Sequence, residues 1–212
     1  MNKELAADRQ HVLREFAVSP EAAARLDAFV ELLLVWQKKT NLIAPSTIQT
    51  IWSRHVADSL QILALAPNAK TWIDLGSGGG FPGMVIACAL DPPAVVHLVE
   101  SNGKKAAFLR EAARVTGAPA QIHNLRIEDF NKQFQGHADI VTARALAALP
   151  DLLGFCAPHI KMGAQALLLK GQDIGDELTE AAKYWKIDAE LKESLTDPKA
   201  RILVVRSLER AG

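Results

Sequence analysis

The sequence has no excess of charge of either sign and almost no cysteine. Its 212 residues contain 24 Lys and Arg against 24 Asp and Glu, so it lacks the basic character with which some proteins coat nucleic acid through charge alone. This balance still allows a small basic patch beside a pocket. The two cysteines, Cys88 and Cys156, fit no zinc-binding or redox spacing and stand among apolar residues. We therefore expect two buried thiols and a reducing, cytoplasmic setting.

Long apolar segments and metal-binding motifs are also missing. The longest unbroken apolar run, Met84–Leu90, is far too short to cross a bilayer. The N-terminal residues MNKELAADRQ are charged and contain no apolar stretch of the kind that a secretory signal requires. The six histidines are scattered and form no HExxH motif. The sequence thus predicts no membrane span, no secretory signal and no protein-bound metal.

Residues 1–68 are predicted to form a helical extension. Ser19 is a suitable N-cap, and Pro20 suits the first helical position. Ser46 and Gln49 form a capping box for a second helix that continues towards residue 66, and Arg54 and Asp58 within it are spaced as an i,i+4 ion pair. The apolar stripe of this second helix consists of Ile48, Trp52, Val56, Leu60 and Leu63.

Over residues 69–212, short apolar segments typical of strands alternate with helical segments. Strands are expected at TWIDL, VVHLVE, QIHNL, ADIVTA, AQALLLK and RILVVRSL. Repeated β-then-α units predict an α/β core with a mainly parallel sheet and helices on both faces. Ligands bind such sheets at the carboxyl ends of the strands, where the strand order reverses. Functional residues are therefore expected directly after the strands.

A glycine-rich turn, Asp74–Gly83 (DLGSGGGFPG), follows the first strand. Its glycines let the backbone approach a ligand closely, and the N–H groups of the next helix point back at that ligand. Two ligand classes compete. The run from Gly78 to Gly83 satisfies the GxGxxG pattern of dinucleotide-binding proteins. Asp74, two residues before Gly76, instead suits a ligand that carries an ammonium and a sulfonium group, as S-adenosylmethionine does.

A second carboxylate, Glu100, ends the next strand. A carboxylate at this position accepts hydrogen bonds from the ribose hydroxyls, which NAD and S-adenosylmethionine share, so Glu100 does not separate the two ligands. Asp74 and the residues that follow it favour S-adenosylmethionine. A nicotinamide-dependent oxidoreductase is kept as the alternative.

Over about residues 30–172, the order of motifs resembles that of one known family. The motifs are the glycine turn, Val99–Ser101 (VES), Lys104–Leu109 (KKAAFL), Arg144-Ala145, Lys170-Gly171, Trp36 with Asn41-Leu42, and Arg54-His55 with Asp58-Ser59-Leu60. Together they resemble the bacterial small-subunit (16S) ribosomal RNA guanine-N7 methyltransferase G family, also called the glucose-inhibited division protein B family.

The resemblance implies a class I S-adenosylmethionine-dependent methyltransferase fold that acts on N7 of a guanine in 16S ribosomal RNA. It implies cofactor contacts at Gly76, Gly78, Phe81, Ile127, Glu128 and Arg144. Asp74 and Glu100 complete the predicted cofactor site. Arg144 is also the candidate catalytic residue, and it either holds the methionine carboxylate of the cofactor or orients the guanine.

The candidate RNA-binding residues are Arg54, His55, Lys104, Lys105 and Lys170. Guanine N7 has a free lone pair and no proton, so its methylation needs alignment of the reacting atoms and no general base. The expected partner is 16S ribosomal RNA, alone or within the small subunit. A non-catalytic RNA-binding assembly factor is the remaining alternative.

Overall fold

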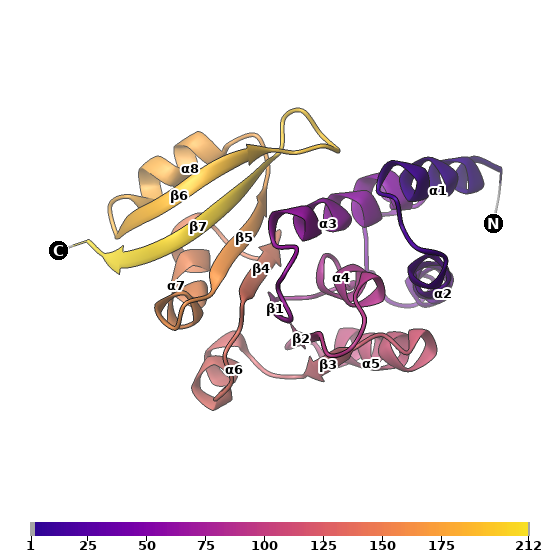
Figure 1. Ribbon diagram of the computed structural model, residues 1–212, viewed down its shortest axis with the longest axis horizontal. Helices are drawn as coiled ribbons and strands as arrows, with labels where there is room; N and C mark the ends of the chain where they lie inside the picture. The colour runs from indigo at the N-terminus through magenta and orange to yellow at the C-terminus, as the bar shows by residue number, and fades with distance from the viewer. Residues whose placement is uncertain (1–2, 212) are drawn as a thin grey trace.

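A computed structural model describes residues 3–211 and contains one seven-stranded sheet (Figure 1). The strands are β1 (Thr71–Leu75), β2 (Val95–Val99), β3 (Ala120–His123), β4 (Ile140–Arg144), β5 (Gln165–Lys170), β6 (Trp185–Glu193) and β7 (Arg201–Arg210). Their order across the sheet is β3-β2-β1-β4-β5-β7-β6. Strands β1 to β5 run parallel, whereas β7 is antiparallel to both β5 and β6. The predicted α/β fold with a mainly parallel sheet is confirmed.

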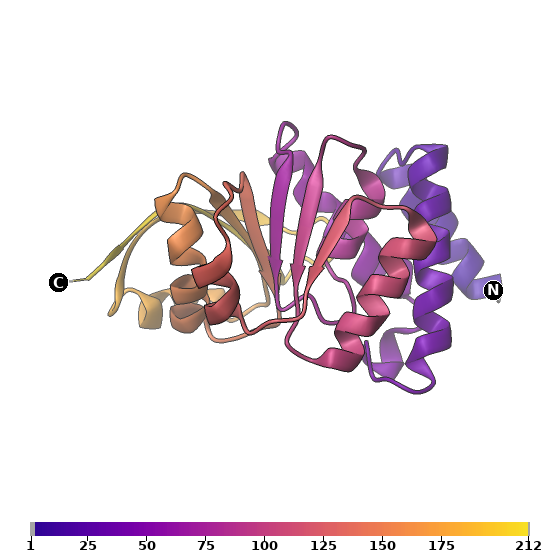
Figure 2. The same cartoon turned by 90° about the horizontal axis from the view of Figure 1, so that it is seen from below.

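Helices cover both faces of this sheet (Figure 2). The longer helices are α1 (Lys3–Glu15), α2 (Pro20–Gln37), α4 (Gly83–Ala89), α5 (Gly103–Thr116), α6 (Ile127–Gln133), α7 (Leu149–Lys161) and α8 (Ile174–Ala181). Alternate strand residues supply two separate cores, because successive side chains of a strand point to opposite faces. Trp72 joins the core formed with the N-terminal helices, α4 and α5, whereas Ile73 joins the core formed with α6, α7 and α8.

The predicted N-terminal helices are present, but the second one begins differently from the prediction. As expected, Ser19 caps α2, and its Oγ accepts the Ala22 N–H at 3.2 Å. The prediction of a capping box at Ser46 and Gln49 is wrong, because Pro45–Thr47 forms a separate 3-10 turn, η1. The helix begins after this turn and runs through a π-helical segment, η2 (Trp52–Ala57), a short α3 (Asp58–Leu60) and a 3-10 end, η3 (Gln61–Leu65).

The acceptor for the start of this helix comes from α1. Oδ2 of Asp8 accepts the N–H groups of Trp52 and Ser53 at 3.0 and 3.2 Å. A carboxylate at a helix N-terminus satisfies N–H groups that have no partner inside the helix and interacts favourably with the helix dipole. The N-terminal helices thus cap one another, and the boundary predicted at residue 68 stays a prediction, since these helices share one core with α4, α5 and the sheet.

The strand order places a reversal point at the centre of the sheet. β1 pairs with β2 on one side and with β4 on the other, so the loops that follow β1 and β4 diverge at their carboxyl ends. Directly after β4, Ala145 adopts the left-handed conformation with φ of 51°. A non-glycine residue in this conformation is strained, and such strain is concentrated at functional sites.

Three elements of the core were not predicted: α6, α8 and β6. Strand β6 alternates exposed and half-buried residues at the edge of the sheet, and it lacks the apolar run that identified the other strands. Both cysteines are buried, as expected. Within residues 3–211, no helix combines the length and apolarity needed to cross a bilayer.

Candidate functional site

The glycine loop after β1 is held by the carboxylate that ends β2. Oε2 of Glu100 accepts the Gly78 N–H at 2.9 Å, and Oε1 accepts the Asn102 N–H at 2.7 Å. Gly76 and Gly78 have φ of 70° and 55°, and a Cβ on Gly76 would lie 2.5 Å from Cδ1 of Leu146. The loop therefore requires glycine for both its conformation and its packing.

Asp74 lies beneath this loop with only 1% of its surface exposed. Its Oδ2 accepts the Gly83 N–H at 3.1 Å, whereas its Oδ1 is buried without a hydrogen-bond partner in the described part of the chain. Burial raises the pKa of the Asp74 carboxyl to about 7. An unsatisfied oxygen on a buried carboxyl group is costly, and a cationic ligand would relieve that cost.

Phe81 joins the glycine loop to the helical extension. Its ring centroid lies 5.4 Å from that of Phe29 in α2 and 4.9 Å from that of His55 in η2. The guanidinium carbon of Arg144 lies 5.5 Å from the same ring. The apolar residue of the loop is therefore the point where the first strand, the fourth strand and the N-terminal helices meet.

Arg144, the last residue of β4, is bound by three groups of the helical extension. Its Nη1 lies 3.0 Å from Oδ2 of Asp58 and 3.5 Å from the carbonyl oxygen of Arg54, and its Nη2 contacts Nδ1 of His55. The predicted ion pair between Arg54 and Asp58 is wrong. Asp58 pairs with Arg144, and Nη1 of Arg54 lies 2.9 Å from Oδ2 of Asp197 instead.

His55 is held as a neutral ring in one tautomer. Burial, together with the positive charges of Arg144 and Arg54, lowers its pKa to about 3. Arginine can only donate, so Nδ1 of His55 accepts from Arg144 and Nε2 carries the proton. Nε2 then donates to Oγ1 of Thr47 at 2.8 Å, and Thr47 donates to the carbonyl oxygen of Ala44 at 2.8 Å. This directed chain fixes the orientation of the Arg144 guanidinium.

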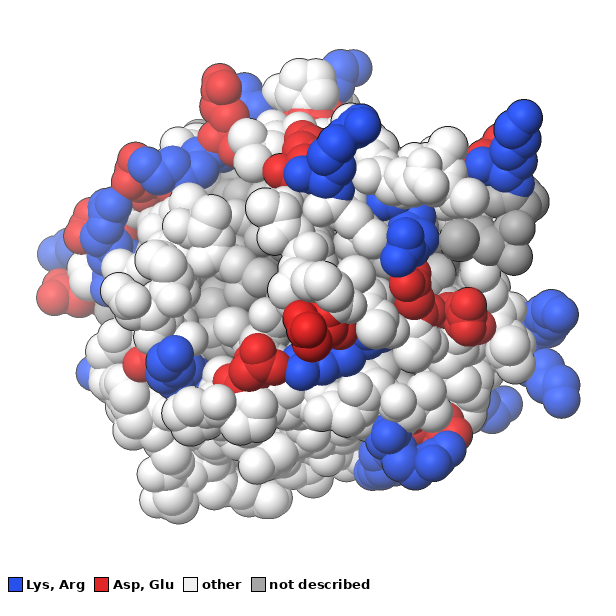
Figure 3. Space-filling model, turned by 45° about the vertical axis from the view of Figure 1, so that its right-hand side comes forward, with Lys and Arg blue, Asp and Glu red and all other residues white. Residues whose placement is uncertain are grey.

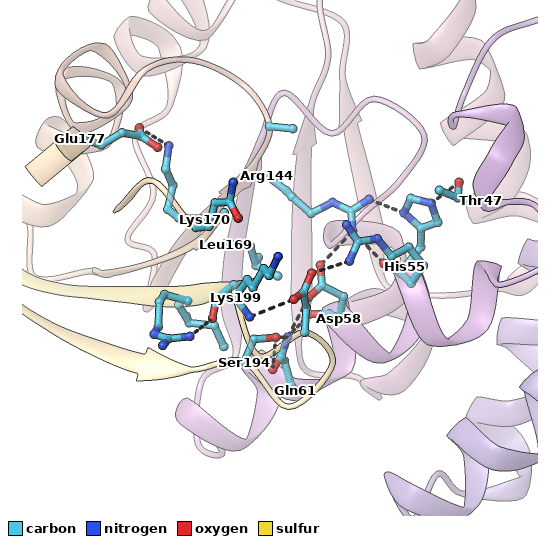
Figure 4. A pocket seen from close by; sticks show the side chains of 18 residues that line it. Thr47, His55, Asp58, Gln61, Arg144, Leu169, Lys170, Glu177, Ser194 and Lys199 are labelled. Atoms are coloured by element: carbon cyan, nitrogen blue, oxygen red, sulfur yellow. Dashed lines mark hydrogen bonds and ion pairs between the residues drawn. The ribbon is translucent and has the colours of Figure 1, made fainter. Parts of the chain in front are cut away.

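A cavity of about 570 Å³ opens beside this cluster (Figure 4). It lies between the helical extension, the ends of β4 and β5, and the loop that joins β6 to β7. Four of the predicted site residues line it: Arg54, His55, Arg144 and Lys170. Lys170 is paired inside the cavity, because its Nζ lies 2.6 Å from Oε2 of Glu177.

The other predicted site residues lie around the same sheet edge and do not line this cavity. Ile127 and Glu128 form the first turn of α6, and Glu128 is exposed in a second cavity of about 760 Å³ that shares no lining residue with the first. Lys104 and Lys105 lie in the first turn of α5, where Oδ1 of Asn102 accepts both backbone N–H groups. The predicted residues thus lie in three places: at the glycine loop, in the Arg144 cavity, and at the starts of α5 and α6.

Several residues of the Arg144 cavity were not predicted as site residues. They are Thr47, Gln61, Glu177, Ser194, Asp197, Lys199 and Arg201. Most of them follow β5 or belong to the β6–β7 loop, where no motif was recognised in the sequence. Only the rule that ligands bind where strands end pointed to the residues after β5.

Charges of both signs are interspersed on the surface. Figure 3 shows Lys and Arg next to Asp and Glu, with uncharged areas between them. In the described part of the chain, no cluster of three or more His, Cys, Asp or Glu side chains is arranged to hold a metal ion.

Comparisons with known proteins identify relatives along nearly the whole chain. Residues 22–204 match the family model described as rRNA small subunit methyltransferase G. A ribosomal RNA small subunit methyltransferase G of Bradyrhizobium sp. (strain BTAi1) is 56% identical over 99% of this chain and 95% of its own length. The protein of the same name from Rhodopseudomonas palustris (strain BisB18) is 57% identical over 97% of this chain and 89% of its own length.

Solved structures share the fold at low sequence identity. An O-methyltransferase from Bacillus cereus in complex with SAH has a TM-score of 0.58 at 14% identity and covers 84% of this chain and 90% of that one. A ribosomal protein L11 methylase from Lactobacillus delbrueckii subsp. bulgaricus has a TM-score of 0.53 at 16% identity and covers 75% and 79%. The fold is that of Rossmann-like methyltransferases, and on its sequence the chain belongs to the rRNA small subunit methyltransferase G family.

Proposed function

We propose that this chain transfers the methyl group of S-adenosylmethionine to N7 of a guanine in 16S ribosomal RNA. Family membership supports an rRNA methyltransferase over a nicotinamide-dependent oxidoreductase or a non-catalytic assembly factor. The observation that carries the proposal is the position of Phe81, which touches both His55 and Arg144 at the carboxyl ends of β1 and β4. A cofactor on the glycine loop and a base in the Arg144 cavity would therefore lie against each other.

The glycine loop and its two carboxylates suit S-adenosylmethionine, whose sulfonium supplies an electrophilic methyl group. The backbone of Gly76 and Gly78 leaves room for close approach. Each Glu100 oxygen accepts one backbone N–H and keeps a lone pair for a ribose hydroxyl. The unpartnered Oδ1 of Asp74 is the acceptor that an ammonium group would satisfy. We assign Ile127 and Glu128, at the start of α6, to the adenine end of the cofactor.

The Arg144 cluster suits a reaction that needs positioning and no proton transfer. His55 has its pKa lowered to about 3 and uses both ring nitrogens in hydrogen bonds, so it is not placed to act as a general base near neutral pH. Guanine N7 has no proton to remove. Arg144 then orients the guanine or the methionine carboxylate, and His55 and Asp58 hold its guanidinium in place.

The cavity beside Arg144 offers groups for a guanine and its phosphates. Asp58 and Gln61 present carboxylate and amide groups near its wall, and Arg54 contributes a half-exposed guanidinium. As the methyl group transfers, positive charge develops on the guanine ring, and a nearby carboxylate such as Asp58 stabilises that charge. Lys104 and Lys105 are assigned to phosphate contacts around the same edge, and Lys170, which is paired with Glu177, is assigned to the RNA-binding wall of the cavity.

Recognition must depend on local shape, because the chain has no net charge. N7 faces the deep and narrow major groove of A-form RNA, which side chains do not reach. The target guanine is therefore expected in a loop or bulge, or turned out of its stack. We propose that the substrate is 16S ribosomal RNA, either alone or within the small subunit, and that the protein acts on it in the cytoplasm.

The test is transfer of a tritiated methyl group to purified small subunits and to their deproteinised RNA, side by side. Borohydride–aniline cleavage then maps the product, because it cuts RNA at N7-methylguanine. We expect label in RNA and one new cleavage position with wild-type protein, and neither with Glu100→Ala. Binding of the RNA without label in either substrate would support an assembly factor. Tight NADH binding without S-adenosylmethionine binding would support the oxidoreductase.

A further inference from the structure

The loop between β6 and β7, residues 194–200, is fastened to the helical extension across the Arg144 cavity. Oγ of Ser194 and Oγ1 of Thr196 lie 3.2 and 3.4 Å from Nε2 of Gln61, and the Leu195 N–H donates to Oε1 of Gln61 at 2.8 Å. Thr196 also donates to Oδ1 of Asp58 at 2.9 Å. Gln61 and Ser194 are buried, so these bonds are made away from competing water and hold the loop firmly.

This fixed loop presents one large apolar side chain to solvent. Leu195 is 70% exposed, the highest value among the large apolar side chains that are exposed in residues 3–211. Its neighbours Ser194 and Thr196 turn their side chains towards Gln61 and Asp58, while its own backbone N–H is bonded. The hydrogen bonds of the loop therefore hold an exposed leucine in a fixed position.

Two cations that form no ion pair in residues 3–211 follow this leucine in the chain. Nη1 of Arg201 donates only to the carbonyl oxygens of Pro198 and Ala200, each at 2.7 Å, so its positive charge is not neutralised. Lys199 forms no ion pair in the described part of the chain, and the nearby carboxylate of Asp197 is paired with Arg54. Both residues line the same cavity as Arg144.

We propose that Leu195, Lys199 and Arg201 form an RNA-docking arm at the mouth of the Arg144 cavity. Leu195 packs against an unstacked base next to the target guanine, and Lys199 and Arg201 contact the phosphates of that strand. Apolar wedges that hold a base step open and cations that contact phosphates are two of the means by which proteins hold displaced nucleotides. The arm rests on the proposed function and specifies how its substrate is held.

The pattern of charge and exposure favours RNA over a protein partner. Leu195 is a single apolar group between polar residues, whereas protein interfaces are centred on contiguous apolar patches. A single side chain can be inserted at one base step, and cations outside ion pairs can contact phosphates. Lys199, Arg201 and the neighbour of Leu195, Ser194, line the cavity, so the arm borders the space that nucleotides flanking an inserted base would occupy.

The arm is tested with Leu195→Ala and with the double variant Lys199→Gln/Arg201→Gln. Leu191→Ala is the matched control, because Leu191 is an exposed leucine on the same hairpin that lies within β6, outside the loop that borders the cavity. For each protein, methyl transfer is measured on deproteinised small-subunit RNA and on small subunits, RNA affinity by filter binding, cofactor affinity by calorimetry, and the melting temperature by circular dichroism.

We expect Leu195→Ala to weaken RNA binding and to lower kcat/KM about tenfold, with cofactor affinity and melting temperature unchanged. Leu195→Met, which keeps an apolar side chain of similar length, should recover most of this loss. In the double variant, the slope of log affinity against log salt concentration should fall by about 2, one for each lost phosphate contact. Leu191→Ala should behave as wild type.

Equal RNA affinity in wild type and Leu195→Ala would overturn the proposal. An effect of Leu195→Ala on small subunits but not on their deproteinised RNA would also overturn it, because Leu195 would then contact a ribosomal protein. Failure of the proposed function gives a different result, since the wild-type protein itself would then transfer no methyl group. In that case the filter-binding comparison still tests the arm.

Discussion

The Arg144 side chain joins the end of β4 to the helical extension through two hydrogen bonds, one to Asp58 and one to His55. Its guanidinium bonds to Asp58 and His55, and its side chain is only 20% exposed. Two bonds from one planar fork fix the orientation of an arginine, whereas a lysine offers a single rotating ammonium group. The geometry of the candidate site therefore depends on the guanidinium shape as well as on its charge.

We expect Arg144→Ala to lower the rate of methyl transfer at least about tenfold, equivalent to roughly 1.4 kcal/mol or more in the transition state. Arg144→Lys should recover little of this loss, because lysine cannot contact Asp58 and His55 together with the same geometry. Single-turnover transfer to small-subunit RNA measures the rate, and circular dichroism checks that the fold survives.

Arg110→Ala is the control for this prediction, because Arg110 is an exposed arginine of α5 outside the cavity. It should transfer methyl groups at the wild-type rate. Wild-type turnover in Arg144→Ala would show that Arg144 has no role in methyl transfer. A large loss in both variants would point to a general need for positive charge in RNA binding.

Because of Asp74, the affinity of the glycine loop for its ligand should depend on pH. Burial raises the pKa of its carboxyl to about 7, so the group is mostly neutral below that pH and charged above it. A ligand with an ammonium group binds the charged form better, so its affinity should rise with pH. We expect S-adenosylmethionine affinity to rise about tenfold between about pH 5.5 and pH 7.5, and to stay level in Asp74→Asn. Calorimetric titration at several pH values measures this, and a level wild-type profile would contradict it.

At the scale of elements, the start of the η2–α3 helix depends on a carboxylate of α1. Asp8 accepts the N–H groups of both Trp52 and Ser53. Since Arg54, His55 and Asp58 lie within the next two turns, the same contact sets the helix that carries the Arg144 partners. Folding of the N-terminal helix and order at the candidate site are thereby linked.

Asp8→Ala should reduce the free energy of unfolding by about 1 kcal/mol, the usual cost of losing a capping side chain. Asp8→Asn keeps an acceptor oxygen and should lose clearly less. Urea unfolding of the two variants and the wild type gives the comparison directly. If Asp8→Ala is as stable as Asp8→Asn, the contact with the Trp52 and Ser53 N–H groups does not stabilise the helix.

Local signals in the sequence predicted elements well, and distant contacts decided what was missed. Ser19 and Pro20 mark the start of a helix by local chemistry, and this start was predicted correctly from the sequence. The partners of Arg54 and Asp58 were not, because Asp197 and Arg144 lie 143 and 86 positions away. An i,i+4 spacing is a weak preference of about 0.2–0.5 kcal/mol, and such tertiary partners override it.

The candidate site shows the same division. The glycine loop and Glu100 were predicted because they stand directly after strands, whereas Arg144, the last residue of β4, was predicted from the family resemblance. The β6–β7 loop was not predicted, because its position over the cavity depends on an antiparallel hairpin that returns across β5. No periodic pattern in residues 173–212 predicts that this hairpin folds back beside β5.

At the scale of the whole molecule, buried histidines make the stability of the fold depend on pH. The face covered by α6 and α7 contains a cluster of histidine and phenylalanine rings at β2 and β3. Nδ1 of His97 lies 3.0 Å from Nε2 of His123, and His159 of α7 bonds to Asn131 of α6. Burial lowers the pKa of all three histidines, that of His97 to about 4, with a further contribution from His123.

These lowered pKa values predict a loss of stability on mild acidification. An unfolded histidine takes up a proton near pH 6.5, whereas His97 in the folded protein does not do so until about pH 4. Between these values the unfolded chain binds more protons, so the free energy of unfolding falls as the pH falls. Above pH 6.5 the cluster is neutral in both states and adds no pH dependence. Asp74, whose pKa is raised to about 7, has the opposite effect, but it is one group against several buried histidines. We therefore expect the urea midpoint of the wild type to decrease from about pH 7 to pH 5.

His97→Phe should flatten this decrease, because a phenylalanine ring fills the same space among Phe134 and His123 without taking up a proton in the unfolded state. The slope of the midpoint against pH is the measurement, since the substitution also changes packing and therefore the absolute stability. His11→Asn provides the control, as His11 is an exposed residue of α1, and its slope should match the wild type. If His97→Phe keeps the wild-type slope, the acid sensitivity arises outside the cluster, and His55, whose buried ring has a pKa of about 3, becomes its source.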